Sequence, residues 1–120
     1  MENIIYNDLV RRGYNVDVGV VEYNQTKDNK KKKIQLEVDF VVNRGNIKYY
    51  IQSALALNSE EKKEQKINSL KRIDDSFKKI VVVKDDIIPR YDKQGIYYIG
   101  VKDFLLTDGV FEKNNNYNER

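Results

Sequence analysis

The sequence predicts a single α/β domain in which a mixed sheet is flanked by helices, with its elements in the order α-β-β-β-α-β-β-α. Stretches with alternating apolar residues, typical of strands, stand beside stretches with apolar residues every three or four positions, typical of helices. Three strands in a row are followed by a helix and a further strand, which indicates a helix crossing over a mixed sheet. The length of 120 residues fits one domain.

The first element is a helix over residues 2–12, because apolar residues at positions 5, 6, 9 and 10 form a stripe. Gly13 follows as a stop signal. Arg11 and Arg12 fall in the last turn, where cations interact favourably with the helix dipole. We therefore expect the helix to end at Gly13 and to bury its 5, 6, 9 and 10 face.

Three strands are expected next. Residues 14–23 alternate valines with polar or small residues, residues 24–33 are a polar hairpin loop, and residues 34–42 show the clearest alternation in the chain. That central strand is expected to place Ile34, Leu36, Val38, Phe40 and Val42 on one face and Gln35, Glu37, Asp39 and Val41 on the other. Turn residues 43–46 then lead into an antiparallel strand over residues 47–55.

The second half of the chain is expected to supply the crossover helix and the remaining strands. Asn58, with Glu61 three positions on, is the expected cap of a helix that runs to about Ile73. Its inner stripe is Ile67, Leu70 and Ile73. The later elements are a buried strand over 79–83, a loop over 89–95, a strand over 95–99 and a short helix over 101–106. The domain is expected to cover residues 1–108, with a polar tail over 109–120.

The amino-acid composition excludes several kinds of functional site. The chain has no cysteine and no histidine, so thiolate chemistry, disulfides and histidine-based zinc sites are excluded. The net charge of +3 is smaller than the four charges of Lys30–Lys33 alone, so the basic character is local. No apolar run approaches the roughly 20 residues of a membrane span, and the acidic start does not resemble a secretory signal. A cytoplasmic location is therefore expected.

Carboxylates on the central strand are the first candidates for chemistry. Glu37 and Asp39 lie two positions apart, so an ideal strand points both toward one face. They are either a solvated edge or part of a metal site. On the next strand Gln52 and Ala54 share a face that lies beside these carboxylates in a tight hairpin. An acid on one strand followed by an acid-x-lysine pattern on the next would be a site for magnesium-dependent hydrolysis.

These segments, together with Glu2 on the first helix, resemble the PD-(D/E)xK nucleases, especially their Holliday-junction-resolvase-like branch. The chain is still more similar to the C-terminal domain of unknown function carried by many bacterial and archaeal AAA-type ATPases. The similarity spans residues 2 to about 107. The motifs that carry it, in order, are Glu2–Tyr6, Arg11–Tyr14, Leu36–Phe40, Tyr50–Gln52 and Leu70–Asp75. The resemblance implies a restriction-endonuclease-like core.

The resemblance also implies roles for four residues. Glu2 corresponds to the first-helix acid, Asp39 to the metal ligand, Gln52 to the second acid and Ala54 to the lysine. The last two depart from the active pattern, and losing one positioned charge typically lowers a rate about 10²–10³-fold. We therefore expect no catalysis and treat all four as vestigial. No cofactor is expected, although weak magnesium binding by Glu37, Asp39 and Gln52 stays open.

Three functions stay open at this point. The first is a non-catalytic accessory or binding domain of an AAA-type ATPase, with DNA as a candidate partner. The second is a residual magnesium-dependent nuclease, rescued by a lysine of the second helix such as Lys62, Lys63 or Lys66. The third is a plain protein-interaction domain. Candidate nucleic-acid contacts are Lys30, Lys31, Lys32, Lys33, Lys62 and Lys66, although a lysine run is also typical of a solvated loop.

The resemblance implies an N-terminal ATPase module as partner. The phosphate-binding pattern G-x-x-x-x-G-K-[ST] does not occur among the six glycines, so ATP binding by that route is not expected of this chain. We accordingly expect it to be the C-terminal piece of a longer protein.

Overall fold

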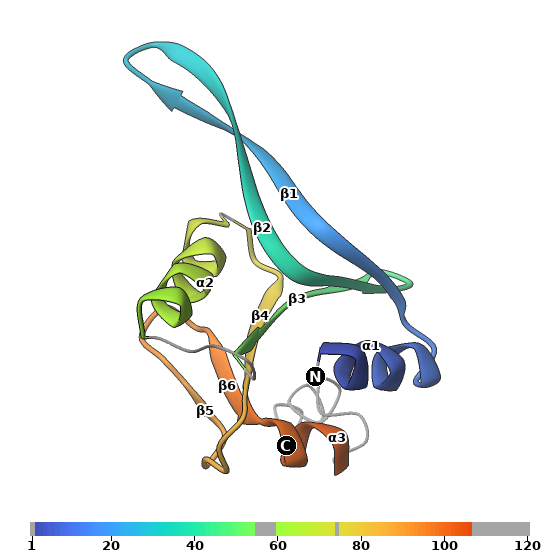
Figure 1. Cartoon of the computed structure of the whole chain (residues 1–120). Coiled ribbons are helices and arrows are strands. Elements are labelled where there is room, and N and C mark those ends of the chain that lie inside the picture. The colour runs from blue at the N-terminus through green and yellow to red at the C-terminus, as the bar shows by residue number, and fades with distance from the viewer. Residues whose placement is uncertain (1, 55–59, 74, 107–120) are drawn as a thin grey trace, which may run out of the picture.

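A computed structural model describes residues 2–54, 60–73 and 75–106, and shows one mixed sheet with helices on both faces (Figure 1). The elements in order are α1 (Glu2–Arg11), β1 (Asn15–Lys27), β2 (Lys30–Arg44), β3 (Ile47–Ala54), α2 (Glu60–Arg72), β4 (Lys78–Val83), β5 (Arg90–Tyr91), β6 (Tyr97–Gly100) and α3 (Val101–Leu106). The predicted mixed α/β architecture with flanking helices is confirmed. The expected cap at Asn58 and the expected tail over 109–120 lie outside the described residues.

Within the described residues the sheet has six strands, in the order β1-β2-β3-β4-β6-β5. β1, β2 and β3 are antiparallel neighbours, whereas β3, β4 and β6 run parallel. The expected element order missed β5, which pairs Arg90 with Tyr98 and Tyr91 with Tyr97 inside the expected loop. Two residues are too few to show any alternation, and the preceding Pro89 pointed to a loop.

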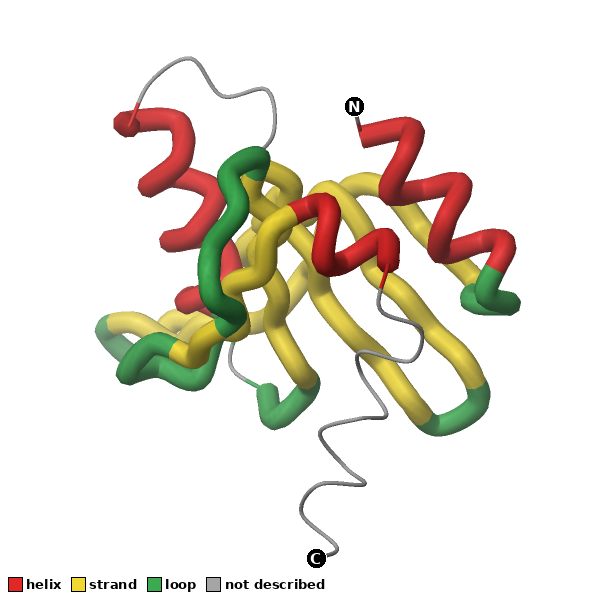
Figure 2. Tube along the Cα trace, turned by 90° about the horizontal axis from the view of Figure 1, so that it is seen from below, coloured by secondary structure: helices red, strands yellow, loops and turns green. Residues whose placement is uncertain are grey.

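Apolar side chains fill both faces of this sheet. One core joins the sheet to α1 and α3 and the other joins it to α2, as the layers in Figure 2 show. Successive residues of β4 alternate between the two cores, which explains the continuous apolar run that predicted a buried strand. The predicted stripe of α2 is confirmed: Leu70 and Ile73 are buried and Ile67 packs beside them.

The expected single apolar face of β2 is wrong, because the strand contains an irregularity near Asp39. Asp17 pairs with Val41 and Gly19 with Val38, so two steps on β1 match three on β2. An extra residue in one strand exchanges the faces on its two sides. Leu36 and Val38 therefore pack on the α2 side of the sheet, and Phe40 and Val42 pack on the α1 side.

The expected loop over residues 24–33 is also wrong. β1 and β2 continue as a two-stranded ribbon that projects beyond the sheet, with a turn at Asp28 and Asn29 (Figure 1). Both turn residues have positive φ, 54° and 64°, which is the geometry of a two-residue type I′ hairpin. Near the base of this ribbon Val18 and Val20 are exposed, because no helix or strand of the described residues covers them.

Helix α1 packs on the sheet through a narrower face than expected. Ile5 and Leu9 are buried, but Tyr6 and Val10 are exposed. The place beside Leu9 is taken by Asp8, whose carboxylate lies 2.8 Å from the guanidinium of Arg12. Arg12 also donates to the backbone oxygen of Phe104 at 2.8 Å, so this buried ion pair fastens α1 to α3.

We expect the protein to lose stability in alkali because of Tyr98 on β6. Burial raises its pKa to about 12, and its hydrogen bond to Asp92 adds to the effect. Because the folded-state pKa is raised, stability is unaffected below about pH 10 and falls as pH rises toward 12, by about 1.4 kcal/mol per pH unit. Urea unfolding between pH 9 and pH 12 should show this decline, and Tyr98→Phe should make it shallower. An unchanged slope in the variant would contradict the assignment.

Candidate functional site

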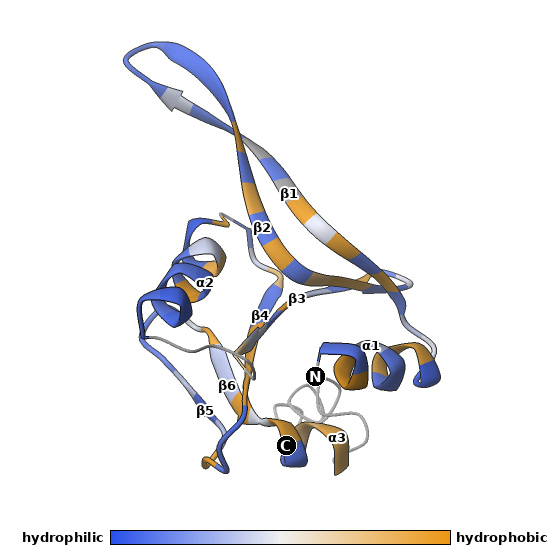
Figure 3. Ribbon diagram, viewed as in Figure 1, coloured by the Kyte–Doolittle hydropathy of each residue, from blue (hydrophilic) through white to orange (hydrophobic). Residues whose placement is uncertain are grey.

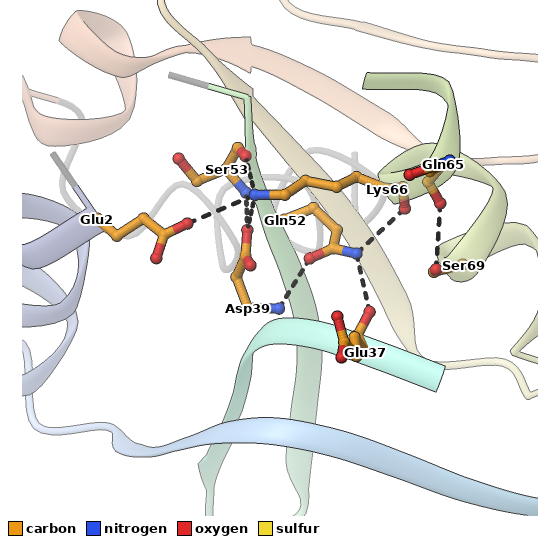
Figure 4. Close-up of polar contacts among 8 residues, drawn as sticks. All are labelled: Glu2, Glu37, Asp39, Gln52, Ser53, Gln65, Lys66 and Ser69. Atoms are coloured by element: carbon orange, nitrogen blue, oxygen red, sulfur yellow. Dashed lines mark hydrogen bonds and ion pairs between the residues drawn. The ribbon is translucent and has the colours of Figure 1, made fainter. Parts of the chain in front are cut away.

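Several of the predicted site residues, among them Glu2, Asp39 and Gln52, meet where β2 and β3 separate beneath α2 (Figure 4). Backbone pairing between β2 and β3 ends at Phe40 and Ile51. Beyond that point Asp39 and Gln52 lie across the opening from each other, and Lys66 of α2 reaches down to them. A small cavity of about 100 Å³ remains, lined by Glu37, Asp39, Gln52, Gln65, Lys66 and Ser69.

The side-chain amide of Gln52 continues the interrupted strand pairing. Its Oε1 accepts a hydrogen bond from the backbone N–H of Asp39 at 2.7 Å. Its Nε2 donates to the backbone oxygens of Glu37 and Lys66, both at 3.1 Å. Gln52 is only 2% exposed, and both of its amide hydrogens have acceptors. A carboxylate could not make the last two bonds, since it has no hydrogen to donate.

The carboxylate of Asp39 is held by two donors. Its Oδ2 accepts from the backbone N–H of Ser53 at 2.7 Å and from Nζ of Lys66 at 2.8 Å. The Asp39 side chain is 18% exposed and that of Lys66 is 27% exposed, so the ion pair is partly shielded from water. Its attraction is therefore stronger than that of a surface pair.

Among the described residues, Lys66 Nζ has three oxygen neighbours for its three hydrogens. Besides Asp39 these are the backbone oxygen of Ser53, at 2.8 Å, and Glu2 Oε1, at 3.4 Å. The structure thus brings the predicted residues Glu2, Asp39 and Gln52 together around Lys66. Figure 4 shows the ammonium at the centre of this group, with Glu2 approaching from the start of α1.

The oxygens around Lys66 are of the kind that magnesium prefers, but the site as built does not fit a cation. The Asp39 and Ser53 oxygens already bind the ammonium. Gln52 Oε1 accepts from a backbone N–H. The Glu37 side chain is exposed, and its backbone oxygen accepts from Gln52 Nε2. Within the described residues, no cluster of three or more carboxylates is arranged to hold a metal.

The remaining predicted residues lie elsewhere. Ala54 packs against the core under α2 and contributes no polar group. Lys62 is exposed on α2, and Lys63 lines a separate cavity of about 230 Å³ with Tyr98 and Arg90. Lys30–Lys33 lie at the end of the β1–β2 ribbon, well away from the site (Figure 1).

Two contributions were missed by the sequence interpretation. The backbone N–H and oxygen of Ser53 both serve the site, and a backbone role leaves no signal in the residue type. Lys66 was named only as one of three candidate lysines. Its spacing could have singled it out: it precedes the buried Leu70 by four positions and Ile73 by seven, so it lies on the inner face of α2.

In the parts of the chain that the structure covers, none of the helices has the length and apolar character to cross a membrane.

Comparison with known proteins places residues 1–104 in a family described as a domain of unknown function, DUF4143. The chain is also 32% identical over 108 residues to an uncharacterized protein of Haemophilus influenzae. That alignment covers 88% of this chain but 22% of the relative, so the chain spans about a fifth of that protein's length.

Proposed function

We propose that this chain, which belongs to the DUF4143 family, is a non-catalytic, nuclease-like accessory domain that binds a partner on behalf of an AAA-type ATPase. The observation that carries the proposal is the ammonium of Lys66, which sits among Glu2, Asp39 and the Ser53 backbone oxygen. A fixed positive charge stands where hydrolysis would need an exchangeable metal ion.

The charge balance of the site supports this proposal. One ammonium faces the two carboxylates of Asp39 and Glu2, at 2.8 and 3.4 Å. A divalent cation would add two positive charges beside Nζ and would have to displace it from Asp39. Like charges at such distances repel by several kcal/mol at the effective dielectric of a protein surface, about 4 kcal/mol at 4 Å. Metal binding is therefore disfavoured while Lys66 stays in place.

Gln52 supports the proposal independently. In a magnesium-dependent nuclease the second acid must turn its oxygens toward the metal. Gln52 instead uses its amide to link β2, β3 and α2. Its role is structural, so the departure from the acid-x-lysine pattern is compensated by packing and hydrogen bonding.

A residual nuclease is the second candidate, and one observation favours it. That hypothesis required a lysine amine beside Asp39, and Lys66 provides one at 2.8 Å. However, a catalytic lysine must act together with a bound metal, whereas this amine binds the oxygens that the metal would use. The geometry therefore supports the non-catalytic function better.

A cleavage assay separates the two candidates. The 120-residue chain is incubated with Mg²⁺ or Mn²⁺ and with duplex, single-stranded and branched DNA. We expect no cleavage above that of the Asp39→Ala variant, prepared in parallel to reveal contaminating nucleases. Metal-dependent cleavage that disappears in Asp39→Ala would overturn the non-catalytic proposal.

The ATPase part of the proposal rests on the sequence resemblance. The relative in Haemophilus influenzae extends well beyond the aligned segment, which is 22% of its length, and so has room for a further module. In this proposal that module hydrolyses ATP, and this chain supplies a binding surface.

A further inference from the structure

We infer that the β1–β2 ribbon is a double-stranded DNA-binding arm whose basic tip, residues 24–33, enters the major groove and contacts phosphates on both sides. This inference deepens the proposed function, because it names the partner and the surface that the accessory domain would use. The surface is separate from the Lys66 site, so the two proposals can fail independently.

Charge is the first argument. The tip contains five lysines and one aspartate, which gives it a net charge of +4, while the whole chain carries +3. The rest of the protein is therefore about neutral to slightly acidic, and the positive field is concentrated at one projecting end. Concentrated positive charge is the electrostatic signature of a phosphate-binding surface.

Most of these lysines have no ion-pair partner among the residues that the structure describes. Lys33 lies 3.0 Å from Glu22. For Lys30, Lys31 and Lys32, no carboxylate of the described part of the chain lies within ion-pair distance, and all three are exposed. Like charges at adjacent positions repel one another and do not help the ribbon to fold. An external polyanion would relieve that repulsion.

The ribbon also has the right shape. Regular pairs run from Asn24 and Lys33 to Lys27 and Lys30 and close in a two-residue turn. Consecutive strand residues point to opposite faces, so the side chains of Lys30–Lys33 lie on both faces of the ribbon. The major groove of B-DNA is about 12 Å wide and about 8.5 Å deep and admits a two-stranded ribbon.

The length of the ribbon is sufficient. Six consecutive pairs, from Glu22 and Gln35 to Lys27 and Lys30, extend toward the turn. At about 3.3 Å per residue they span about 17–20 Å, which is twice the groove depth. The ribbon projects beyond the sheet and helices (Figure 1). The tip can therefore reach the groove floor while the rest of the domain stays outside the duplex.

The composition of the tip favours DNA over a protein partner. Residues 24–33 contain no apolar or aromatic side chain, as the hydrophilic end of the ribbon in Figure 3 shows. Protein interfaces depend on buried aromatic and aliphatic anchors, and lysine is depleted in them. The tip instead offers lysine, asparagine, glutamine and threonine, which suit phosphates and base edges. The deep, narrow major groove of A-form RNA would not admit such a ribbon.

The test measures binding of the 120-residue chain to a labelled duplex by fluorescence anisotropy between low and moderate salt. Each phosphate contact contributes about −0.9 to the slope of log K against log salt concentration, so four contacts predict a fall of roughly 100-fold from about 50 to 200 mM. The variant K30Q/K31Q/K32Q should bind about 10–100-fold more weakly at low salt and should lose about 2.7 from that slope.

The matched control K71Q/K93Q/K102Q removes the same charge from exposed lysines outside the arm. It should retain most of the affinity and slope, and thermal unfolding should show both variants folded. Equal losses in the two triple variants, or equal binding of double-stranded RNA, would overturn the arm proposal. So would a polyglutamate that competes as well as DNA, because the tip would then be a general acidic-protein site.

The DNA-binding test and the cleavage assay test the two proposals separately. Absence of duplex binding with no cleavage removes the arm proposal and leaves the non-catalytic domain standing. Duplex binding that depends on the arm, together with metal-dependent cleavage, supports the arm and removes the non-catalytic proposal.

Discussion

Replacing Gln52 with glutamate is expected to destabilise the domain by about 3–5 kcal/mol at pH 7, although the two side chains have nearly the same shape. Gln52 is 2% exposed and donates to the backbone oxygens of Glu37 and Lys66. A carboxylate would lose both donated bonds and would place a negative charge against two carbonyl oxygens. The loss is measured by urea or thermal unfolding of the variant and the unchanged protein.

The pH dependence of the loss identifies its cause. The introduced carboxyl is buried without a donor for its second oxygen, so its folded-state pKa is raised. With a raised pKa, the destabilisation is greatest above that pKa and shrinks as the pH falls and the group becomes neutral. The difference between Gln52→Glu and the unchanged protein should therefore be smaller near pH 4 than at pH 7.

Gln65→Glu is the matched control. Gln65 lies on α2, lines the same small cavity and is exposed. The same chemical change there should cost about 0.5 kcal/mol or less, as for ordinary surface substitutions. Equal losses at both positions would show that added negative charge, rather than the lost amide bonds, destabilises the protein. Gln52→Glu should also fail to create DNA cleavage, because Lys66 still binds the oxygens that a metal would use.

Elements with strong periodic patterns could be predicted from the sequence. The stripe of Leu70 and Ile73 located the buried face of α2, and the apolar run of β4 located a central strand. The β2–β3 hairpin followed from the turn residues around Gly45. In each case a single local pattern, either periodic spacing or turn chemistry, determined the element.

Features that depend on two segments together could not be predicted. The irregularity near Asp39 is a mismatch between β1 and β2, and neither strand alone reveals it. The ribbon tip over residues 24–33 is exposed on both faces, so it lacks the alternation that marks a strand with one buried face. Its polar composition suggested a loop, because polar residues are expected where no core is formed.

The site itself was half predictable. Glu2, Asp39 and Gln52 were identified by their similarity to a motif, and the structure brings them together. Similarity to the motif suggests that they are remnants of a metal site, whereas in the folded protein each one makes a hydrogen bond or an ion pair. Those roles follow from the approach of α2 to the open end of the hairpin, which sequence spacing does not specify.

Lys66→Met is expected to convert the site into one that binds divalent cations. Removing the ammonium leaves the Asp39 carboxylate, the Ser53 backbone oxygen and the Glu2 carboxylate around one position. These are oxygen ligands of the type that Mg²⁺, Mn²⁺ and Ca²⁺ accept. Without a cation the variant should be less stable by about 1–3 kcal/mol, because a partly buried carboxylate loses its counter-charge.

The diagnostic measurement is thermal unfolding of this variant with and without Mn²⁺. A cation at tenfold its dissociation constant adds about 1.4 kcal/mol to the stability of a folded state that binds it. For a domain of this size that is a rise in midpoint of several degrees, about 4–8 °C. The unchanged protein should show no such rise, since its own ammonium occupies the position and repels the metal.

Two control variants test which residues bind the cation in Lys66→Met. Lys71→Met, on the exposed last turn of α2, should gain no cation dependence, because Lys71 is not at the site. Adding Asp39→Asn to Lys66→Met should abolish the gain, because the neutral amide removes the charge that attracts the metal. A rise in midpoint with Mn²⁺ in the unchanged protein would contradict the view that Lys66 stands in place of a cation. That result would also weaken the non-catalytic proposal, since the site would then bind the ion that hydrolysis requires.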